Sequence, residues 1–279
     1  TSRPRYFQIR GIGERSQYVG EGAPNFSVGF MVDGIDFSGI GMTGMLFDMQ
    51  QIEVFKGPQS SIYGPNAIAG LINITSAQPT PYIAGKSMIS IGSDNQKLAG
   101  FAVGGPLSSK LLFRFAFQKH SQNGFRENVF KNLTNTNKRN EMYTRIKLNW
   151  AITPIVNLHF VSFNSNLNNG YDVWSVDNNK DYITYSDEQG MDSQKSYSNS
   201  FKINCKDIIG ANAFYQYTNS TNKMEHSYDG DWADSAYWYN NHNFDPEVEG
   251  WSYEFFDSNA KNRTSLTQEL RASIGSLII

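Results

Sequence analysis

After about residue 80, apolar and charged side chains alternate strictly within segments of about ten residues. Four apolar residues share one face of the segment 111–118, namely Leu111, Phe113, Phe115 and Phe117. Arg114 lies on the opposite face, and 141–151 and 264–274 repeat the alternation, again with full charges on the polar face. Successive side chains of a strand point to opposite faces, so this period of two predicts β-strands. Water or charged partners must therefore lie on the polar side.

The alternation predicts eight strands separated by connections of two kinds. The strands are expected at 83–93, 96–105, 110–120, 141–151, 154–164, 196–204, 209–222 and 264–274. Most approach the roughly 9–11 residues that a tilted strand needs to cross a bilayer. Three connections are short (105–110, 152–154 and 205–208), and three are long (121–140, 165–195 and 223–263). Every long loop falls at one end, as in an outer-membrane barrel with short periplasmic turns and long extracellular loops.

The first 80 residues contain a different pattern of four short blocks. These are FQIRGIG (7–13), VGFMVDGI (28–35), IEVFKG (52–57) and LINIT (71–75). Each is rich in β-branched or aromatic residues and is bounded by glycine or proline, which predicts short strands. Asp33-Gly34 is a tight-turn signal between two such strands. A sheet this small covers little core by itself, so we expect it to pack inside something larger.

These four blocks, with the loop GPQSSIYG at 57–64, closely resemble the plug domain of TonB-dependent outer-membrane receptors. The resemblance covers roughly residues 5–80. It implies a transporter of the bacterial outer membrane that is not an enzyme and needs no cofactor. The family takes up a scarce ligand, such as a ferric siderophore, cobalamin or a glycan. Its partners are the TonB-ExbB-ExbD complex and outer-membrane lipid.

The resemblance also implies a domain organisation. The fold class is mainly β: the C-terminal part of an α+β plug (residues 1–80), followed by antiparallel transmembrane barrel strands (residues 81–279). About 8 strands of the roughly 22 in such a barrel are expected here. The family carries its signal sequence, coupling segment and first plug residues upstream, so the chain is expected to be a fragment that cannot transport alone.

Charged residues inside the plug blocks are candidates for holding the plug within the barrel. Arg10, Asp33, Glu53 and Lys56 interrupt apolar blocks, so a plug in a lumen would bury them and require partners. Candidate partners on the predicted strands are Arg114, Arg145, Lys147, Glu269 and Arg271. The alternative is solvation at strand ends. The full set of candidate plug residues is Arg10, Gly11, Asp33, Gly34, Glu53, Lys56, Gly57, Pro58, Tyr63, Gly64, Gly70 and Asn73.

The loop 223–263 is rich in aromatic and acidic residues and is a candidate ligand-contact loop. The proposed contacts are Trp232, Tyr237, Trp238, Tyr239 and Trp251. Rigid aromatic rings beside carboxylates suit a ring-bearing, sugar-like or cationic ligand. The alternative is a loop that packs its own aromatics. The acidic residues argue against a strongly anionic siderophore, because like charges repel at an entrance.

Other function classes find little support. The net charge is −2 and the sequence has no basic stripe, so it lacks the basic surface that is typical of nucleic-acid-binding proteins. GPQSSIYG lacks the Lys-Ser/Thr of a phosphate-binding loop, and the four histidines lack metal-ligand spacing. Cys205 is the only cysteine, so no internal disulfide forms. The runner-up interpretation is a secreted β-rich carbohydrate-active enzyme or adhesin.

Overall fold

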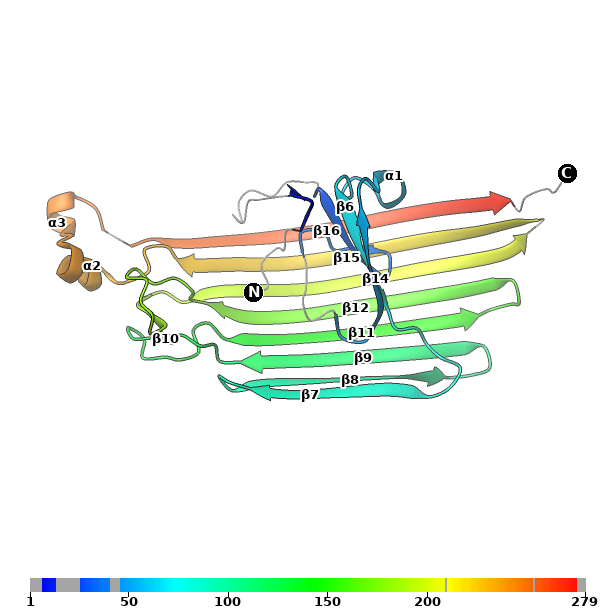
Figure 1. Cartoon of the computed structure of the whole chain (residues 1–279), viewed down its shortest axis with the longest axis horizontal. Coiled ribbons are helices and arrows are strands. Elements are labelled where there is room, and N and C mark those ends of the chain that lie inside the picture. Colours follow the sequence, from blue (N-terminus) through cyan, green and yellow to red (C-terminus); the bar gives the residue numbers. More distant parts are fainter. Residues whose placement is uncertain (1–6, 14–25, 41–45, 209, 253, 275–279) are drawn as a thin grey trace.

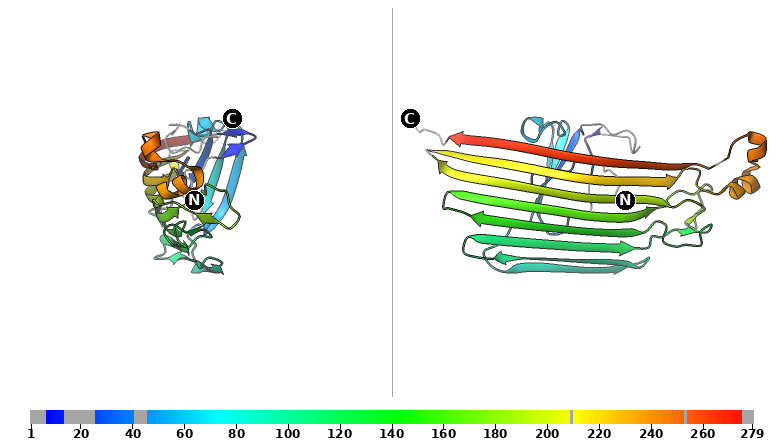
Figure 2. Two further views of the ribbon diagram at one scale, coloured as in Figure 1. Left: turned by 90° about the vertical axis from the view of Figure 1, so that its left-hand side faces the viewer. Right: turned by 180° about the vertical axis from the view of Figure 1, so that it is seen from behind.

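The computed structural model describes residues 7–13, 26–40, 46–208, 210–252 and 254–274. They form a large antiparallel sheet and a small mixed sheet. The small sheet lies on the concave side of the large one, and its strands run across the direction of the large sheet's strands (Figures 1 and 2). Within the described residues, no helix is long and apolar enough to cross a membrane.

The large sheet contains eight strands in chain order and is open at both edges. The strands are β7 (Ala84–Gly92), β8 (Gln96–Pro106), β9 (Leu111–Gln122), β11 (Arg139–Ala151), β12 (Val156–Tyr171), β14 (Gly190–Ile208), β15 (Ala211–Asp229) and β16 (Phe256–Ile274). The predicted fold class, a plug-like sheet followed by antiparallel barrel-type strands, is confirmed.

The later strands are longer than their sequence pattern suggests. β14, β15 and β16 each span 19 residues. At about 3.3 Å per residue they reach roughly 60 Å, about twice the hydrocarbon thickness of a bilayer. Their extensions are rich in Ser, Asn and Thr on both faces, so they show no apolar alternation. Backbone pairing between neighbouring strands continues regardless of side-chain polarity, and the long loops are correspondingly shorter than expected.

Small elements lie among the long loops. β10 (Glu127–Asn128) pairs in parallel with β13 (Ile183–Thr184). α2 (Ser235–His242) and α3 (Pro246–Glu249) stand at the far left of Figure 1. Asp234 and Asp245 cap these helices by accepting backbone N–H groups, which satisfies otherwise unpaired donors. The turns that follow β8, β11 and β14 lie at the opposite end, called the short-turn end below.

The small sheet has the strand order β4-β3-β6-β5. Its elements are β3 (Val28–Val32), β4 (Ile35–Asp36), β5 (Met49–Lys56) and β6 (Gly70–Ser76), with the one-turn helix α1 (Ser60–Tyr63) between the last two. β1 (Gln8–Ile9) and β2 (Ile12–Gly13) form a separate hairpin. All four sequence blocks therefore contain strands.

The two sheets share one hydrophobic core. Phe37 of the small-sheet segment is fully buried, and its ring meets Phe163 of β12 edge-on, with centroids 5.8 Å apart. The cluster is completed by Phe30, Val32, Ile35, Ile74, Tyr143 and Leu167. Because residues from both sheets build it, neither sheet buries this surface without the other.

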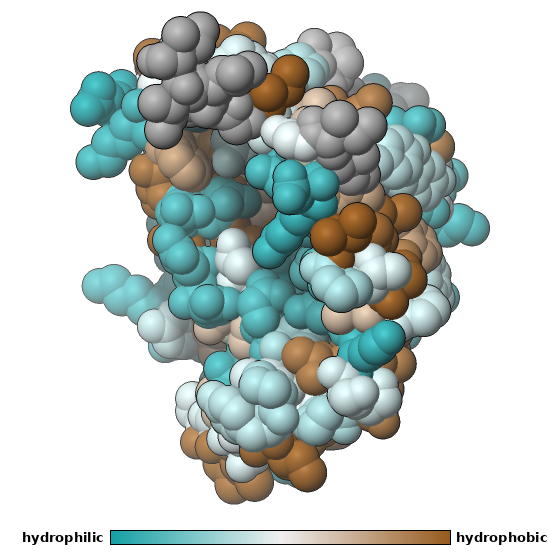
Figure 3. Space-filling view, turned by 90° about the vertical axis from the view of Figure 1, so that its right-hand side faces the viewer, coloured by the Kyte–Doolittle hydropathy of each residue, from teal (hydrophilic) through white to brown (hydrophobic). Residues whose placement is uncertain are grey.

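The two faces of the large sheet differ as the alternation predicts. Arg114, Arg145 and Lys147 are buried toward the small sheet, whereas Ile91 is 82% exposed and Leu270 is 75% exposed on the outer face. Viewed from the short-turn end, hydrophilic side chains gather in the hollow and hydrophobic patches lie along the outer rim (Figure 3). This is the polarity that a lipid-embedded wall around a polar lumen requires.

The turn at Asp33 and Gly34 brings the small sheet against β15. Both residues have positive φ, 50° and 81°, as a type I′ hairpin turn requires. A Cβ built on Gly34 would lie 2.2 Å from Nε2 of Gln216. That amide donates a hydrogen bond to Ser200 at 3.1 Å, so a side chain at position 34 would displace it.

We expect Gly34→Ala to cost about 1–2 kcal/mol of backbone strain plus about 1 kcal/mol for the disturbed Gln216 bond. Urea unfolding monitored by tryptophan fluorescence measures the sum. Gly11→Ala is the matched control, because Gly11 has a φ of 77° and no atom within 4 Å of its added Cβ. Equal costs for the two variants would show that the approach to β15 contributes nothing.

Candidate functional site

Asp48 ties the small sheet to β9 and β11 through buried guanidinium groups. It lies just before β5 and is 1% exposed. Arg114 donates to it through two atoms, Nε to Oδ2 at 2.7 Å and Nη2 to Oδ1 at 2.6 Å. Nη2 of Arg145 lies 3.3 Å from Oδ2 and donates to the Asp48 carbonyl at 2.8 Å. Such two-point pairing fixes orientation as well as distance.

The electrostatics of this contact favour the charged carboxylate. Burial raises the pKa of Asp48, but the Arg114 hydrogen bonds and the charges of Arg114, Arg145 and Lys86 outweigh burial, so the net pKa is lowered. Lys86 Nζ is 3.6 Å away with a half-exposed side chain. Asp48 therefore remains ionised to a lower pH than an ordinary aspartate does.

Lys147 makes a second contact between the sheets. Its Nζ lies 3.1 Å from Oδ1 of Asp33 and 2.9 Å from Oγ of Ser76. The Ser76 N–H also donates to Asp33 Oδ1, at 3.0 Å. Lys147 and Asp33 side chains are each 5% exposed. The charges are thus paired and hydrogen-bonded, which burial demands.

Contacts on the β16 side are weaker and more solvated. Arg263 donates to the Ser38 carbonyl and lies 3.6 Å from Oδ2 of Asp36, with its side chain 27% exposed. Arg271 donates to the Ile62 carbonyl of α1 at 3.3 Å and also bonds Glu269. The firm attachment is therefore at β9 and β11, and the β16 side is held more loosely.

Apart from Asp33 and Gly34, which contact the large sheet, the candidate plug residues lie in the strands, the hairpin and the loops of the plug. Glu53 accepts a hydrogen bond from Asn73 at 3.0 Å within the small sheet. Arg10 and Gly11 form the positive-φ turn of the β1-β2 hairpin, and Lys56 is exposed at the end of β5. Positive φ angles occur at Gly57, Gly64 and Gly70. Pro58 lies in the loop after β5. The centroid of the Tyr63 ring lies 6.1 Å from that of the Phe55 ring.

Asp48 is the residue that sequence reasoning missed. It stands outside the four blocks, immediately before the IEVFKG strand. A signal was available, because three cations on one face of adjacent strands require carboxylates opposite them. Which plug acid supplies them depends on how the small sheet is seated, and local sequence does not encode that.

The aromatic residues of the long loops do not converge on one surface. Trp232 stacks on Trp174, with centroids 6.1 Å apart, and Tyr237 meets Tyr185 at 4.8 Å. The remaining candidates pack locally or point outward: Trp238 on His242, Trp251 on Phe244, and Tyr239 54% exposed. The Trp174–Trp232 and Tyr185–Tyr237 pairs each join two different loops, and the two tryptophans are the more exposed of these rings.

A carboxylate cluster joins the same loops. Oxygen atoms of Asp187, Asp229 and Asp231 lie within 4.8 Å of one another. Carboxylate oxygens are ligands for hard cations. Here, however, Asp229 already accepts the N–H groups of Asp187, Asp231 and Trp232, and Asp231 accepts those of Ala233 and Phe255. Burial, with Asp229 nearby, raises the pKa of Asp187 to about 6 and that of Asp231 to about 8.

The TonB-dependent Receptor Plug Domain model matches residues 1–71, and the open eight-stranded sheet follows directly. This chain is a TonB-dependent receptor plug domain with part of its barrel. TonB-dependent receptors reside in the bacterial outer membrane. The predicted family and localisation are thereby confirmed.

Curated relatives agree with this membership. The pesticin receptor of Yersinia pestis is 29% identical over 105 residues, 38% of this chain and 15% of the relative. The vitamin B12 transporter BtuB of Vibrio vulnificus is 27% identical over 124 residues, 42% of this chain and 20% of the relative. The ferrioxamine B receptor of Salmonella typhimurium is 28% identical over 116 residues, 16% of its length. The chain thus spans less than a quarter of these receptors.

Solved structures support the fold. The ferric yersiniabactin uptake receptor FyuA of Yersinia pestis superposes with a TM-score of 0.65 at 13% identity, covering 98% of this chain and 56% of FyuA. The siderophore receptor PiuA of Acinetobacter baumannii gives 0.64 at 14% identity, covering 88% of this chain and 35% of PiuA. Both receptors therefore share the fold of this chain over the regions that superpose.

Proposed function

We propose that the protein carrying this chain imports a scarce small ligand across the outer membrane, with energy from the TonB-ExbB-ExbD complex. The observation that carries the proposal is the seating of the plug sheet against the barrel strands through buried ion pairs and a shared core. Such a plug closes the lumen at rest. Polar contacts can be exchanged for water when the plug is displaced, so the closure is reversible.

The domain roles follow from the same arrangement. We assign residues 1–80 to the plug and 81–279 to the barrel, with the change between β6 and β7. The loops that follow β9, β12 and β15 are proposed to face the outside, where they meet the ligand. The Trp174–Trp232 pair favours a ligand with a flat ring or face.

The ligand class is proposed from the relatives' names. Ferric siderophore receptors and a vitamin B12 transporter are among them, so a ferric siderophore or cobalamin comes first. A glycan remains the alternative, because aromatic faces also stack on sugar rings. The runner-up, a carbohydrate-active enzyme or adhesin, has no support from the family.

Uptake by cells tests the proposal. We expect a strain deleted for the gene to lose accumulation of one radiolabelled ligand from a panel of ferric siderophores, cobalamin and oligosaccharides. The complete gene should restore it, and a background without TonB should not accumulate the ligand. Unchanged uptake of the entire panel, or uptake that persists without TonB, would contradict energy-coupled import.

A further inference from the structure

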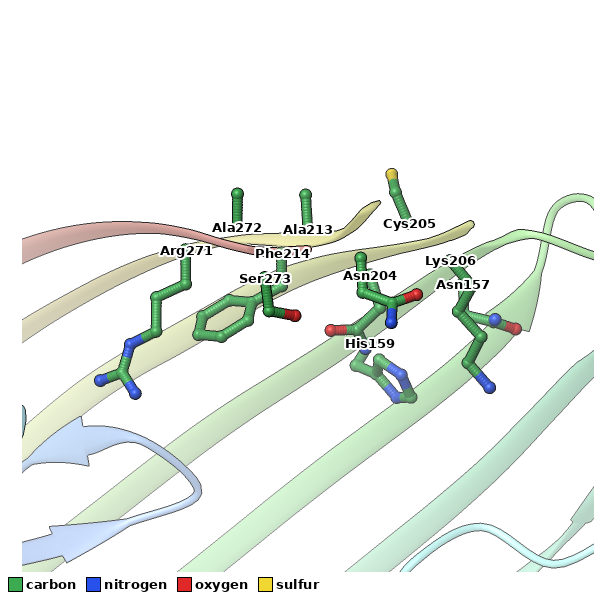
Figure 4. A pocket seen from close by; sticks show the side chains of 11 residues that line it. Asn157, His159, Asn204, Cys205, Lys206, Ala213, Phe214, Arg271, Ala272 and Ser273 are labelled. Atoms are coloured by element: carbon green, nitrogen blue, oxygen red, sulfur yellow. The ribbon is translucent and has the colours of Figure 1, made fainter. Parts of the chain in front are cut away.

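Between the plug and the short-turn end, the lumen face of β12, β14, β15 and β16 is hollowed into a cavity of about 700 Å³. His159, Asn204, Lys206, Phe214 and Arg271 are among its lining residues. Figure 4 shows His159, Asn204, Phe214 and Arg271 projecting to the side of the sheet on which plug strands lie. A volume of this size suits a small molecule.

Strand alternation supplies the polar side chains of this lining. Cys205, Ala213 and Ala272 project to the opposite, outer face in Figure 4. Their neighbours along each strand must therefore enter the lumen. Lys202, Asn204 and Lys206 are alternate residues of β14 and therefore lie on the same, inner face of the sheet.

The cavity carries an excess of positive charge. Lys202 Nζ lies 4.1 Å from the Phe214 ring centroid, and Arg271 Cζ lies 5.6 Å from it. Arg271 is paired with Glu269. Lys147, which lines an adjoining pocket together with Lys202, is paired with Asp33. Neither Lys202 nor Lys206 takes part in any ion pair of the described residues. Lys206 lines this cavity and Lys202 lines an adjoining pocket that shares His159 and Asn204 with it, so two lysines outside any ion pair of the described residues lie along one continuous hollow.

We propose that this cavity binds a small anion that carries two or more carboxylate or phosphate groups. Lys202 and Lys206 supply the positive charge. A cation–π contact with the Phe214 ring holds the Lys202 ammonium group on the lumen face of the sheet. Amide groups of Asn157 and Asn204 offer hydrogen-bond donors beside them.

The position suggests when the site acts. It lies on the far side of the plug from the acidic long-loop cluster of Asp187, Asp229 and Asp231. A ligand that has passed the plug would meet this cationic wall before leaving the lumen. That role rests on the proposed import function, whereas anion binding itself does not.

Citrate is the probe, titrated calorimetrically into the full-length protein in detergent at low salt. We expect saturable binding that weakens as salt is added. The double variant Lys202→Gln/Lys206→Gln should weaken binding by at least about tenfold, since both unpaired charges are removed. Lys195→Gln removes a charge from the exposed outer face of the same strand and is the matched control.

Phe214→Leu keeps both lysines and should weaken binding less than the double variant, by loss of the cation–π contact. Heat-modifiable electrophoretic mobility confirms that each variant retains its barrel. Absence of saturable citrate binding, or equal loss in the Lys195→Gln control, would overturn the proposal. The uptake panel is measured separately, so failure of anion binding leaves the import function untouched and the reverse also holds.

Discussion

Asp48→Asn is expected to loosen the plug more than any other single substitution in this chain. It removes the carboxylate that Arg114 and Arg145 share and leaves two guanidinium groups buried without a counter-charge. Breaking a buried pair by removing one partner costs about 3–5 kcal/mol. Urea unfolding and limited proteolysis of the plug segment should both report this loss, with the barrel still resistant.

Asp94→Asn is the matched control, because Asp94 has nearly the same φ (55° against 61°) but lies exposed in the turn between β7 and β8. It should change stability by less than about 0.5 kcal/mol. The double variant Asp48→Asn/Arg114→Gln should recover part of the loss, since one unpaired charge is removed. Additive losses in the double variant would show that the pair does not hold the plug.

Raising the pH is expected to open the layer of long loops, which is the second large effect. The folded-state pKa values of Asp187 and Asp231, about 6 and about 8, lie above the ordinary carboxyl value. The folded loops therefore bind more protons than the open loops do. Stability from these groups is fully present below about pH 4 and is lost as the pH rises through about 6 and about 8.

Amide exchange across residues 185–189 and 229–233, corrected for the intrinsic pH dependence, measures this opening. We expect opening to increase by on the order of tenfold or more across that window, since each unit of pKa shift corresponds to a factor of ten. Asp231→Asn should flatten the dependence by removing one of the competing charges.

Asp177→Asn is the control for the pH effect. The pKa of Asp177 is lowered to about 2: burial alone would raise it, but hydrogen bonds from Ser175, Tyr185 and Asn179 outweigh burial. Its contribution is therefore lost only in acid, and the alkaline opening should be unchanged. An identical alkaline opening in Asp231→Asn would assign the effect to groups outside the cluster.

The sequence was informative wherever chemistry repeats locally. The alternation of Phe113, Arg114 and Phe115 assigned one face to lipid and the other to the plug, and the burial of Arg114 follows that assignment. The Asp33-Gly34 turn could be predicted from the sequence, because a type I′ turn requires positive φ at both positions and Asp-Gly is favoured there. The ends of β12, β14 and β15 could not be predicted from the sequence, because the extended parts of these strands are polar on both faces and pair through the backbone.

By itself, the sequence determined the two kinds of sheet, their order along the chain and the family, because strand period, turn chemistry and motif order are local properties. Only the tertiary structure decided that Asp48 receives Arg114 and Arg145, that Trp232 stacks on Trp174, and that Lys202 and Lys206 line two adjoining pockets outside any ion pair of the described residues. These pairings join residues tens of positions apart or depend on how the plug is seated. They are set by the packing of one sheet across another, which no short stretch of sequence records.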